Sequence, residues 1–368
     1  MFKRKFKEWT ENFQRMSEVS DSQSWRYKGQ EYSAEFTHEA AGNDMGIERV
    51  TVVVTTEENG QRLSTEVHMK RLSFSSYAQF INRWDRDVHI HDDELDGRFH
   101  SNSQINLAYS RKVKPRFFGQ VTTSARGINI AESRGYVPRD QIFLGGLQTG
   151  VRAIRLPEHI LSFATEKDTS DENVHQFDED TRITFREDGS YLWQPLDSAY
   201  PQQTFLADSD TWFLVADKDV ELYVRGTVNG KVLVYSPERI VIEGNLVYAE
   251  DPKESAHADD FLGLASDKYV DIAPPDVTGP GDLIIYAAIY AKRRFTVKRY
   301  RFRDTSLLHI YGSLTAGTLS ATEPRYATKI EFDQRLETLR PPRFPMTDQY
   351  AIESWDSNWR VEPAQTVY

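Results

Sequence analysis

The sequence predicts a mainly β protein: a parallel β-helix (solenoid) body preceded by a small α+β N-terminal module, with an antiparallel β-sandwich as the alternative. Three observations lead to this prediction. The first 16 residues carry apolar side chains at helical spacing, the next segment alternates apolar and polar residues, and the remainder carries a loose glycine repeat. We place the module at 1–84, the body at 85–355 and a C-terminal tail at 356–368.

The N-terminal stretch FKRKFKEWTENFQRMSEV predicts an amphipathic helix. Its apolar side chains recur every three or four residues, as on one helix face: Phe2, Phe6, Trp9, Phe13 and Met16. Five basic and two acidic side chains in residues 2–16 make the other face cationic. The apolar stripe either contacts a partner or an anionic membrane surface, or docks on the protein's own domain.

Two shorter elements are predicted after this helix. Residues 47–72 alternate as two strands joined at Asn59-Gly60, a residue pair favoured in type I′ hairpin turns. The stretch SSYAQFINRW, residues 75–84, predicts a short helix capped by Ser75 or Ser76. Residues 1–84 would therefore be a helix, a small antiparallel sheet and a second helix, an arrangement that resembles a pilin.

Five segments of the body share the pattern apolar-x-Gly-x-apolar. Their glycines are Gly97, Gly119, Gly226, Gly244 and Gly312, with 22 residues between the first two and 18 between Gly226 and Gly244. These intervals match one turn of a β-solenoid built from short parallel strands. Glycine accepts positive φ at tight corners, and the flanking apolar residues would point into the core. An antiparallel sandwich with glycine-rich turns would explain several of the same segments.

Two segments predict long surface loops inserted in the body. Residues 166–190 hold nine acidic and three basic side chains, and residues 251–282 contain Pro274-Pro275 and Gly279-Pro280-Gly281. The C-terminal stretch from 339 to 361 is rich in proline and aromatic residues. We expect it to form an extended strap that caps one end of the body.

The segment HIHDDELDGRFHSN, residues 89–102, concentrates histidines and carboxylates. On a regular strand, His89, His91 and Asp93 would share one face, and two imidazoles with a carboxylate can bind a transition metal. Because DDELDG is turn-forming, these three residues are weak metal candidates only. The segment also begins the glycine repeat, and we expect His100-Ser101-Asn102 to hydrogen-bond the next turn.

The segment KRRFTVKRYRFR, residues 292–303, holds seven basic residues and no acid. Arg294, Lys298 and Tyr300 are candidates for a face that binds acidic glycans; the alternative is the outer face of an ordinary alternating strand.

The composition excludes several functions. The net charge of −11 argues against nucleic acid as a partner, and the absence of cysteine excludes disulfides, thiolate metal sites and a cysteine nucleophile. No nucleophile elbow, phosphate-binding glycine loop or dinucleotide fingerprint is present. We therefore predict no enzymatic activity and no cofactor.

Three ordered blocks resemble a family of bacterial cell-envelope proteins. They are LDGRFHSNSQINL with RFFGQVTTS, VLVYSPERIVIEGNLVYAED with DDFLGLASDKYVDI, and LLHIYGSLTAGTLSATEPRYATKIEFDQRLETLRPPRFP. The family consists of β-helix-like proteins associated with type IV pilus and pseudopilus systems, namely minor pilin-like, PilX-type accessory proteins. The resemblance implies a surface domain with a structural or assembly role, and it supplies no catalytic residues.

We therefore expect a non-enzymatic structural or assembly protein of the cell envelope, on the periplasmic or extracellular side. It would be a minor pilin-like or pseudopilin-like subunit or an adhesive element, with other envelope or pilus subunits and surface glycans as partners. The alternatives are a β-helix carbohydrate-active enzyme or glycan-binding module, and a self-assembling scaffold. No prepilin-type apolar helix precedes Phe2, so we expect membrane contact only through a missing or trimmed N-terminal anchor.

Overall fold

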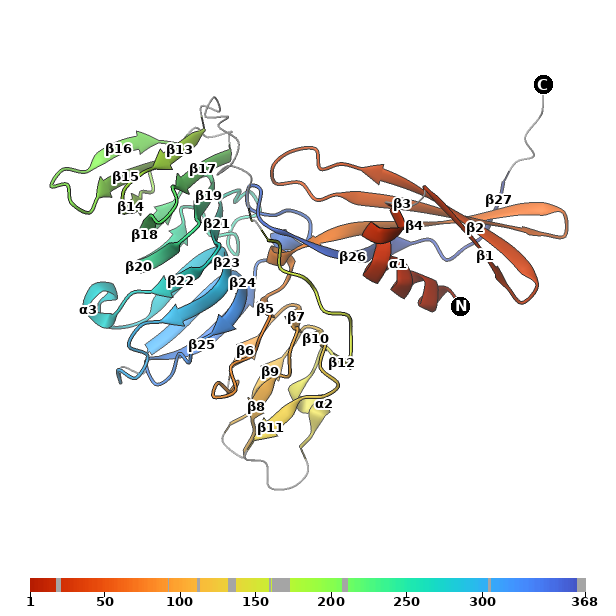
Figure 1. Ribbon diagram of the computed structural model, residues 1–368, viewed down its shortest axis with the longest axis horizontal. Helices are drawn as coiled ribbons and strands as arrows, with labels where there is room; N and C mark the ends of the chain where they lie inside the picture. Colours follow the sequence, from red (N-terminus) through yellow and green to blue (C-terminus); the bar gives the residue numbers. More distant parts are fainter. Residues whose placement is uncertain are drawn as a thin grey trace. The chain divides into compact units, whose positions relative to one another are not determined.

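The computed structural model describes residues 1–17, 21–91, 93–110, 113–131, 137–158, 160, 173–206, 211–303 and 306–362. The chain forms two compact units, both mainly β (Figure 1). The first unit consists of Met1–Leu72 and Met346–Tyr368, and the second unit is Ser73–Pro345. This division differs from the predicted boundaries after residues 84 and 355, because the last strands of the chain return to the first unit.

The first unit is an antiparallel sheet with one helix. Its elements are α1 (Phe2–Ser17), β1 (Ser22–Tyr27), β2 (Gln30–Glu39), β3 (Arg49–Glu58), β4 (Gln61–Ser73), β26 (Met346–Trp355) and β27 (Arg360–Val361). The strand order is β1-β2-β3-β4-β26, and β27 also pairs with β4. Asn59 and Gly60 join β3 to β4 with φ angles of 51° and 73°, which confirms the predicted hairpin.

The apolar stripe of α1 packs on the sheet of its own unit. Trp9 and Phe13 are fully buried, Phe6 is 6% exposed, and Phe2 and Met16 are partly buried in the same core. The sheet and β26 contribute Ala34, Phe36, Val50, Val52, Val54, Val67, Met69 and Tyr350 to this core. Of the two predicted alternatives, the structure therefore shows docking on the protein's own domain, because the alternating apolar residues of the sheet cover the stripe.

The predicted C-terminal strap is divided between the two units. Residues 339–345 belong to the second unit, where Phe344 is fully buried beside Tyr290, and Met346–Trp355 form β26 in the first unit. Arg71 Nε donates a hydrogen bond to the Thr347 carbonyl over 2.7 Å, and Thr347 Oγ1 donates one to the Leu72 carbonyl, also over 2.7 Å. Both ends of the chain thus build one sheet. The second unit is an insertion in the chain between the neighbouring strands β4 and β26.

Among the regular elements of the second unit, nearly all are strands. In chain order its elements are η1 (Phe74–Ser76), β5 (Gln79–Ile81), β6 (Glu94–Leu95), β7 (Phe99–Ser101), β8 (Asn106–Ala108), β9 (Arg116–Phe117), β10 (Val121–Thr123), β11 (Asn129–Ala131), α2 (Arg139–Ile142), β12 (Leu147–Thr149), β13 (Val174–Phe177), β14 (Thr181–Phe185), β15 (Ser190–Pro195), β16 (Gln202–Phe205), β17 (Thr211–Ala216), β18 (Glu221–Val228), β19 (Lys231–Ser236), β20 (Arg239–Tyr248), β21 (Phe261–Ser266), β22 (Tyr269–Ile272), α3 (Pro275–Thr278), β23 (Leu283–Val297), β24 (Ser306–Leu319), β25 (Tyr326–Phe332) and η3 (Gln334–Glu337).

Most strand pairs of the second unit are parallel and fall into three ladders. Ladder A runs β13-β17-β19-β21-β23-β24-β5-β7-β10-β12. Ladder B runs β14-β18-β20-β22-β23-β24, and ladder C runs β18-β20-β23-β24-β25-β6-β9. The long strands β23 and β24 belong to all three ladders. Among the described residues of this unit, antiparallel pairing is confined to β14-β15-β16.

The order of the strands in space differs from their order in the chain (Figure 1). The chain enters at β5, continues to β12 at one end of ladder A, resumes at β13 at the opposite end, and returns to β24, which pairs with β5. The segment after β12 is held by Asn102: its Nδ2 donates to the Ile154 carbonyl over 2.6 Å, and its Oδ1 accepts from the Ile154 N–H over 2.9 Å. The second unit therefore has two runs of strands, β5–β12 and β13–β25.

The glycines of the sequence repeat lie at two kinds of corner. Gly97, Gly119 and Gly312 link ladder C to ladder A, whereas Gly226 and Gly244 link ladder B to ladder C. All ten flanking apolar residues are at most 3% exposed. A Cβ atom on Gly119 would lie 1.9 Å from the Gly97 carbonyl oxygen, whereas one on Gly244 would meet nothing closer than 3.7 Å. The close backbone approach therefore requires glycine at Gly119 and not at Gly244.

Three predicted elements of this unit were wrong. Residues 75–84 hold the end of η1 and the strand β5 instead of a helix, and residues 74–81 are all buried. The described part of 166–190 forms β13 and β14, while residues 166–172 lie outside the described residues. Residues 251–282 contain β21 and β22, and every residue of β21 is buried. Short strands lie between the charged residues or prolines that suggested surface loops. Strands β13 and β14 are partly buried, and β21 is buried throughout.

The close packing at Gly119 predicts a large effect of a single methyl group. We expect Gly119→Ala to destabilise the protein by about 3 kcal/mol, because the new Cβ forces the two backbone corners apart. Gly127→Ala is the matched control, since a Cβ there meets no atom within 4 Å. Chemical denaturation of both variants measures the difference, and equal midpoints would show that the corner is not tightly packed.

Candidate functional site

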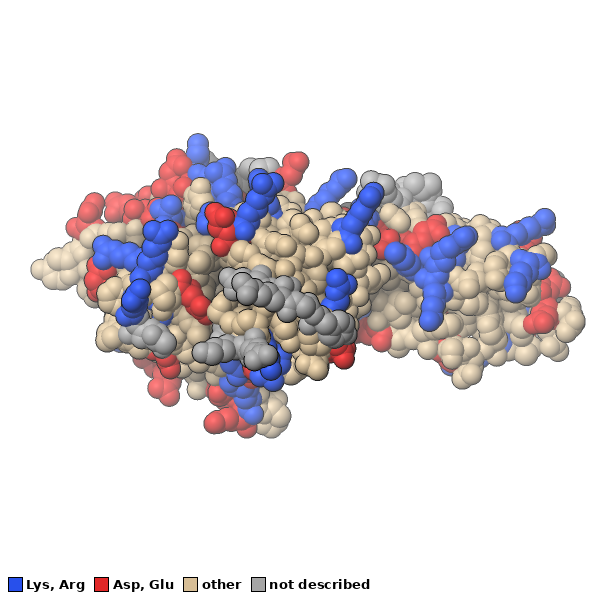
Figure 2. Space-filling view, turned by 90° about the horizontal axis from the view of Figure 1, so that it is seen from below, with Lys and Arg blue, Asp and Glu red and all other residues tan. Residues whose placement is uncertain are grey.

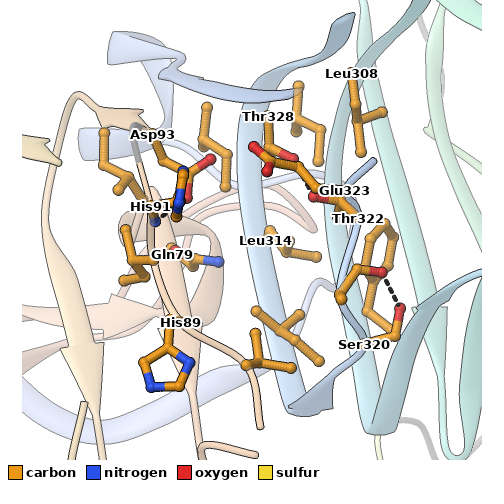
Figure 3. Close-up of a pocket in the computed structure, with 18 of the residues that line it drawn as sticks. Gln79, His89, His91, Asp93, Leu308, Leu314, Ser320, Thr322, Glu323 and Thr328 are labelled. Carbon is orange, nitrogen blue, oxygen red and sulfur yellow. Dashed lines mark hydrogen bonds between the residues drawn. The ribbon is translucent and has the colours of Figure 1, made fainter. Parts of the chain in front are cut away.

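A cavity of about 250 Å³ lies in the second unit between β24, β25 and the segment 84–95 (Figure 3). Its inner wall is apolar and consists of Ile90, Leu95, Phe295, Leu308, Ile310, Leu314 and Ile330, none of which is more than 4% exposed. Leu308, Ile310 and Leu314 come from β24, and Leu95 comes from β6. The cavity is therefore lined by both runs of strands.

An interruption of ladder B leaves this space open. Ladder A continues from β24 into β5, and ladder C continues from β25 into β6. Ladder B instead ends at Leu319 of β24. The nearest parallel pairs of the first run are the isolated bridge Ile90↔Leu107 and the short pair β8-β11. Residues 82–89 form bends and turns in place of a strand. The side chains of this segment consequently do not fill the volume beside Leu319 as a stacked strand would.

The mouth of the cavity is polar and acidic. Figure 3 shows His91 and Asp93 together on one side, with Glu323 extending towards them from the other. The His91 N–H donates to Asp93 Oδ2 over 3.4 Å. Asp87 and Glu94 also line the cavity, whereas no lysine or arginine does so among the described residues. The charged side chains that the structure describes at the mouth are therefore all acidic, apart from the two histidines.

The amide of Gln79 points into the cavity from β5 (Figure 3). The residue is only 6% exposed, and its side chain makes no hydrogen bond with any part of the chain that the structure describes. The amide atoms face the cavity, where they can bond water or a ligand. Gln79 is thus a hydrogen-bonding group directed at the contents of the cavity.

The predicted metal candidates line this cavity without forming a metal centre. His89, His91 and Asp93 all contact it, but His89 lies apart from the other two in Figure 3. No three histidine or carboxylate side chains of the described residues gather closely enough to hold a metal ion. The prediction assumed strand alternation through residues 89–93, and this segment is not a regular strand.

The predicted glycan-binding residues are engaged with neighbouring groups. Arg294 pairs with Asp85 at 3.5 Å, and Lys298 pairs with the buried Asp271 at 3.0 Å. On the face shown in Figure 2, basic and acidic side chains are interspersed. Ion pairing lowers the capacity of Arg294 and Lys298 to bind an anion. Glycan binding by these residues and Tyr300 stays a prediction.

The histidine of His100-Ser101-Asn102 has a structural role. Its ring stacks on Phe80 at 5.2 Å, and its two nitrogens lie 2.8 Å from Thr122 Oγ1 and Asn102 Oδ1. Thr122 is its neighbour in ladder A, which confirms the predicted hydrogen bond to the next turn. Burial lowers the pKa of His100 to about 4, although the bond to Asn102 acts in the opposite direction.

Sequence reasoning missed two residues of the cavity, Gln79 and Glu323. Gln79 is the one polar side chain in the stretch YAQFI, and an isolated polar residue among buried ones was the available signal. Glu323 precedes Pro324 in an exposed turn, and nothing in its local sequence relates it to residues 89–93. Its position depends on the pairing of β25 with β6.

No protein-family profile matches the chain, and no curated protein matches it in sequence. Among solved structures, the crystal structure of the competence-associated pilin ComZ from Thermus thermophilus is similar at 13% sequence identity, over 94% of this chain and 88% of that chain, with a TM-score of 0.35. None of the described helices has the length and apolar character needed to cross a membrane.

The lowered pKa of His100 predicts a loss of stability in acid. The unfolded chain binds a proton near pH 6.5 but the folded protein binds it only near pH 4, so stability falls as the pH is lowered through this window. The full effect of this residue is about 3 kcal/mol. Denaturant unfolding at several pH values should show a shallower loss for His100→Gln, which cannot be protonated. His175 and His309, whose pKa values burial also lowers, are present in both proteins and contribute to both slopes. A slope that is the same in wild type and His100→Gln would therefore contradict the assignment of the effect to His100.

Proposed function

We propose that this chain is a non-enzymatic structural or assembly protein of the bacterial cell envelope, a minor pilin-like or pseudopilin-like subunit. The first unit would make the contacts with other subunits, and the second unit would be the part presented at the surface. Its partners would be other envelope or pilus subunits, and it would act on the periplasmic or extracellular side.

The single observation that carries this proposal is the construction of the first unit. Helix α1 lies on an antiparallel sheet that both ends of the chain complete, and the second unit is inserted between β4 and β26. A helix on an antiparallel sheet is the arrangement that the sequence predicted as pilin-like. An insertion of this kind lets a large domain vary while the helix and sheet keep a common assembly surface.

The exposed face of α1 is the best candidate for that assembly surface. Its apolar stripe is used within the unit, so contacts with partners would involve the cationic face. Lys3, Arg4 and Lys7 are exposed, and Lys7 pairs with Glu11 at 3.7 Å. A cluster of exposed cations favours an acidic partner surface and speeds association with it.

We also propose that the three ladders of the second unit form one parallel β-solenoid with its turns in permuted order. The support comes from β23 and β24, which pass through all three ladders, and from the glycine corners between successive ladders. A rigid body of this kind suits a structural role, because it holds loops in place without a catalytic constellation.

The assembly role predicts that charge reversal on α1 reduces incorporation into surface filaments. In the bacterium that carries the gene, a deletion strain would be complemented with wild type or with Lys3→Glu/Arg4→Glu. We expect the double variant to be severalfold less abundant in the sheared filament fraction, as judged by immunoblot and immunogold electron microscopy, because a partner contact loses two cations.

The matched control reverses two other exposed cations of the first unit, Arg26→Glu/Lys28→Glu, outside α1. Circular dichroism of the purified variants checks that both pairs fold. Wild-type amounts of Lys3→Glu/Arg4→Glu in the filaments would exclude α1 as the assembly surface. A protein found only in the cytoplasm of the host would overturn the envelope assignment itself.

A further inference from the structure

We propose that the cavity beside β24 binds a small primary amine with a short apolar body, such as an alkylamine or arylalkylamine. The apolar part would lie on the inner wall, the amide of Gln79 would bond the ligand, and the ammonium group would lie at the acidic mouth. This inference goes beyond the assembly role and does not depend on it, since the site is formed by the second unit alone.

The inner wall selects an apolar body. Leu308 and Ile310 are fully buried, and Leu314 and Ile330 are 3% exposed, yet all four border the cavity. Apolar walls around a space of this size hold water poorly and gain free energy when a hydrocarbon group replaces it. The volume of about 250 Å³ suits a small molecule and is far too small for a folded partner.

Gln79 supplies the polar anchor within the apolar wall. The residue is 6% exposed, and its amide is directed into the cavity and makes no hydrogen bond with another described residue. Such a group gains a bond only from something inside the cavity. Its carbonyl oxygen can accept from an N–H donor, and a protonated amine supplies that donor.

The mouth selects the sign of the charge. Asp87, Asp93, Glu94 and Glu323 border the cavity without any basic side chain among the described lining residues. Glu94 is paired with Arg116, and binding of an ammonium group does not require the other carboxylates to lack partners. Asp93 and Glu323 approach each other from opposite walls in Figure 3. An ammonium group between these carboxylates is stabilised, whereas a ligand carboxylate there would be repelled.

An organic cation fits this chemistry better than a metal ion. A divalent cation needs several converging oxygen or nitrogen ligands, and the described residues provide no such group. The wall opposite the mouth consists of hydrocarbon side chains, which cannot ligate a metal but can contact an alkyl or aryl group. The combination of an apolar wall and an acidic mouth therefore corresponds to an amphiphilic amine.

Binding of three matched probes to the full chain tests the proposal. Hexylamine, 1-hexanol and hexanoate share one alkyl chain and differ in the head group. Isothermal titration calorimetry and saturation-transfer NMR should rank hexylamine first and hexanoate last at neutral pH. Equal affinities for hexylamine and hexanol, or no binding of hexylamine, would overturn the proposal. Stoichiometric binding of calcium or zinc that displaces hexylamine would replace it with a metal site.

Two variants locate the bound amine. Glu323→Gln should weaken hexylamine binding by about fivefold and leave hexanol unchanged, as expected for loss of a partly screened charge pair. Glu250→Gln, at an exposed glutamate outside the cavity, is the matched control and should bind like wild type. An equal loss in both variants, or none in Glu323→Gln, would overturn the placement of the ammonium group.

Gln79→Leu separates a binding role from a structural one. If the amide serves the ligand, its replacement by an apolar side chain of similar size should raise the melting temperature of the free protein and weaken hexylamine binding. A lowered melting temperature would show that the amide supports the fold instead. Unchanged hexylamine affinity would contradict its role as the anchor.

Discussion

The pairing of β24 with β5 is the contact on which the second unit depends. Leu314 of β24 lies opposite Gln79 of β5, although more than 200 residues separate them in the chain. Ladder C is joined next to it, where Ile330 lies opposite Leu95. Without these pairs each run of strands would end in exposed backbone donors and acceptors. Their parallel register also decides which side chains of the two runs meet.

The pairs β24-β5 and β25-β6 form the joint between the two runs of strands, and this joint also explains the position of the candidate site. Two ladders continue across it, whereas ladder B stops at Leu319 and leaves the cavity beside Ile90. Gln79 belongs to the joint as a paired residue of β5 and to the cavity through its side chain. A substitution that alters the pairing of β24 with β5 will therefore also alter the cavity. A substitution at Gln79 can likewise affect both the cavity and the strand pairing.

Local patterns predicted the elements that depend on neighbouring residues. The stripe from Phe2 to Met16 gave a helix, Asn59-Gly60 gave a hairpin, and the residues flanking Gly97 and Gly312 are buried as expected. The permuted strand order could not be predicted, because it rests on pairing between residues far apart in the chain. For the same reason the sequence directed attention to His89 and His91 but not to Glu323 on the opposite wall. The many charged residues in 173–190 and 251–282 led to the incorrect prediction of surface loops. The structure has short strands between charged turns in both segments.

The stability of the joint bears on whether its cavity serves a ligand. Gln79 lies among apolar side chains at the joint, and no other described residue bonds its amide. A leucine at position 79 would continue the apolar wall, so a sequence that served only to close the joint has a simple apolar alternative available. Features that oppose local stability without a structural return concentrate at functional sites. A ligand that touches Leu314 and Ile90 contacts both runs of strands, and by mass action it would stabilise their junction in proportion to its occupancy.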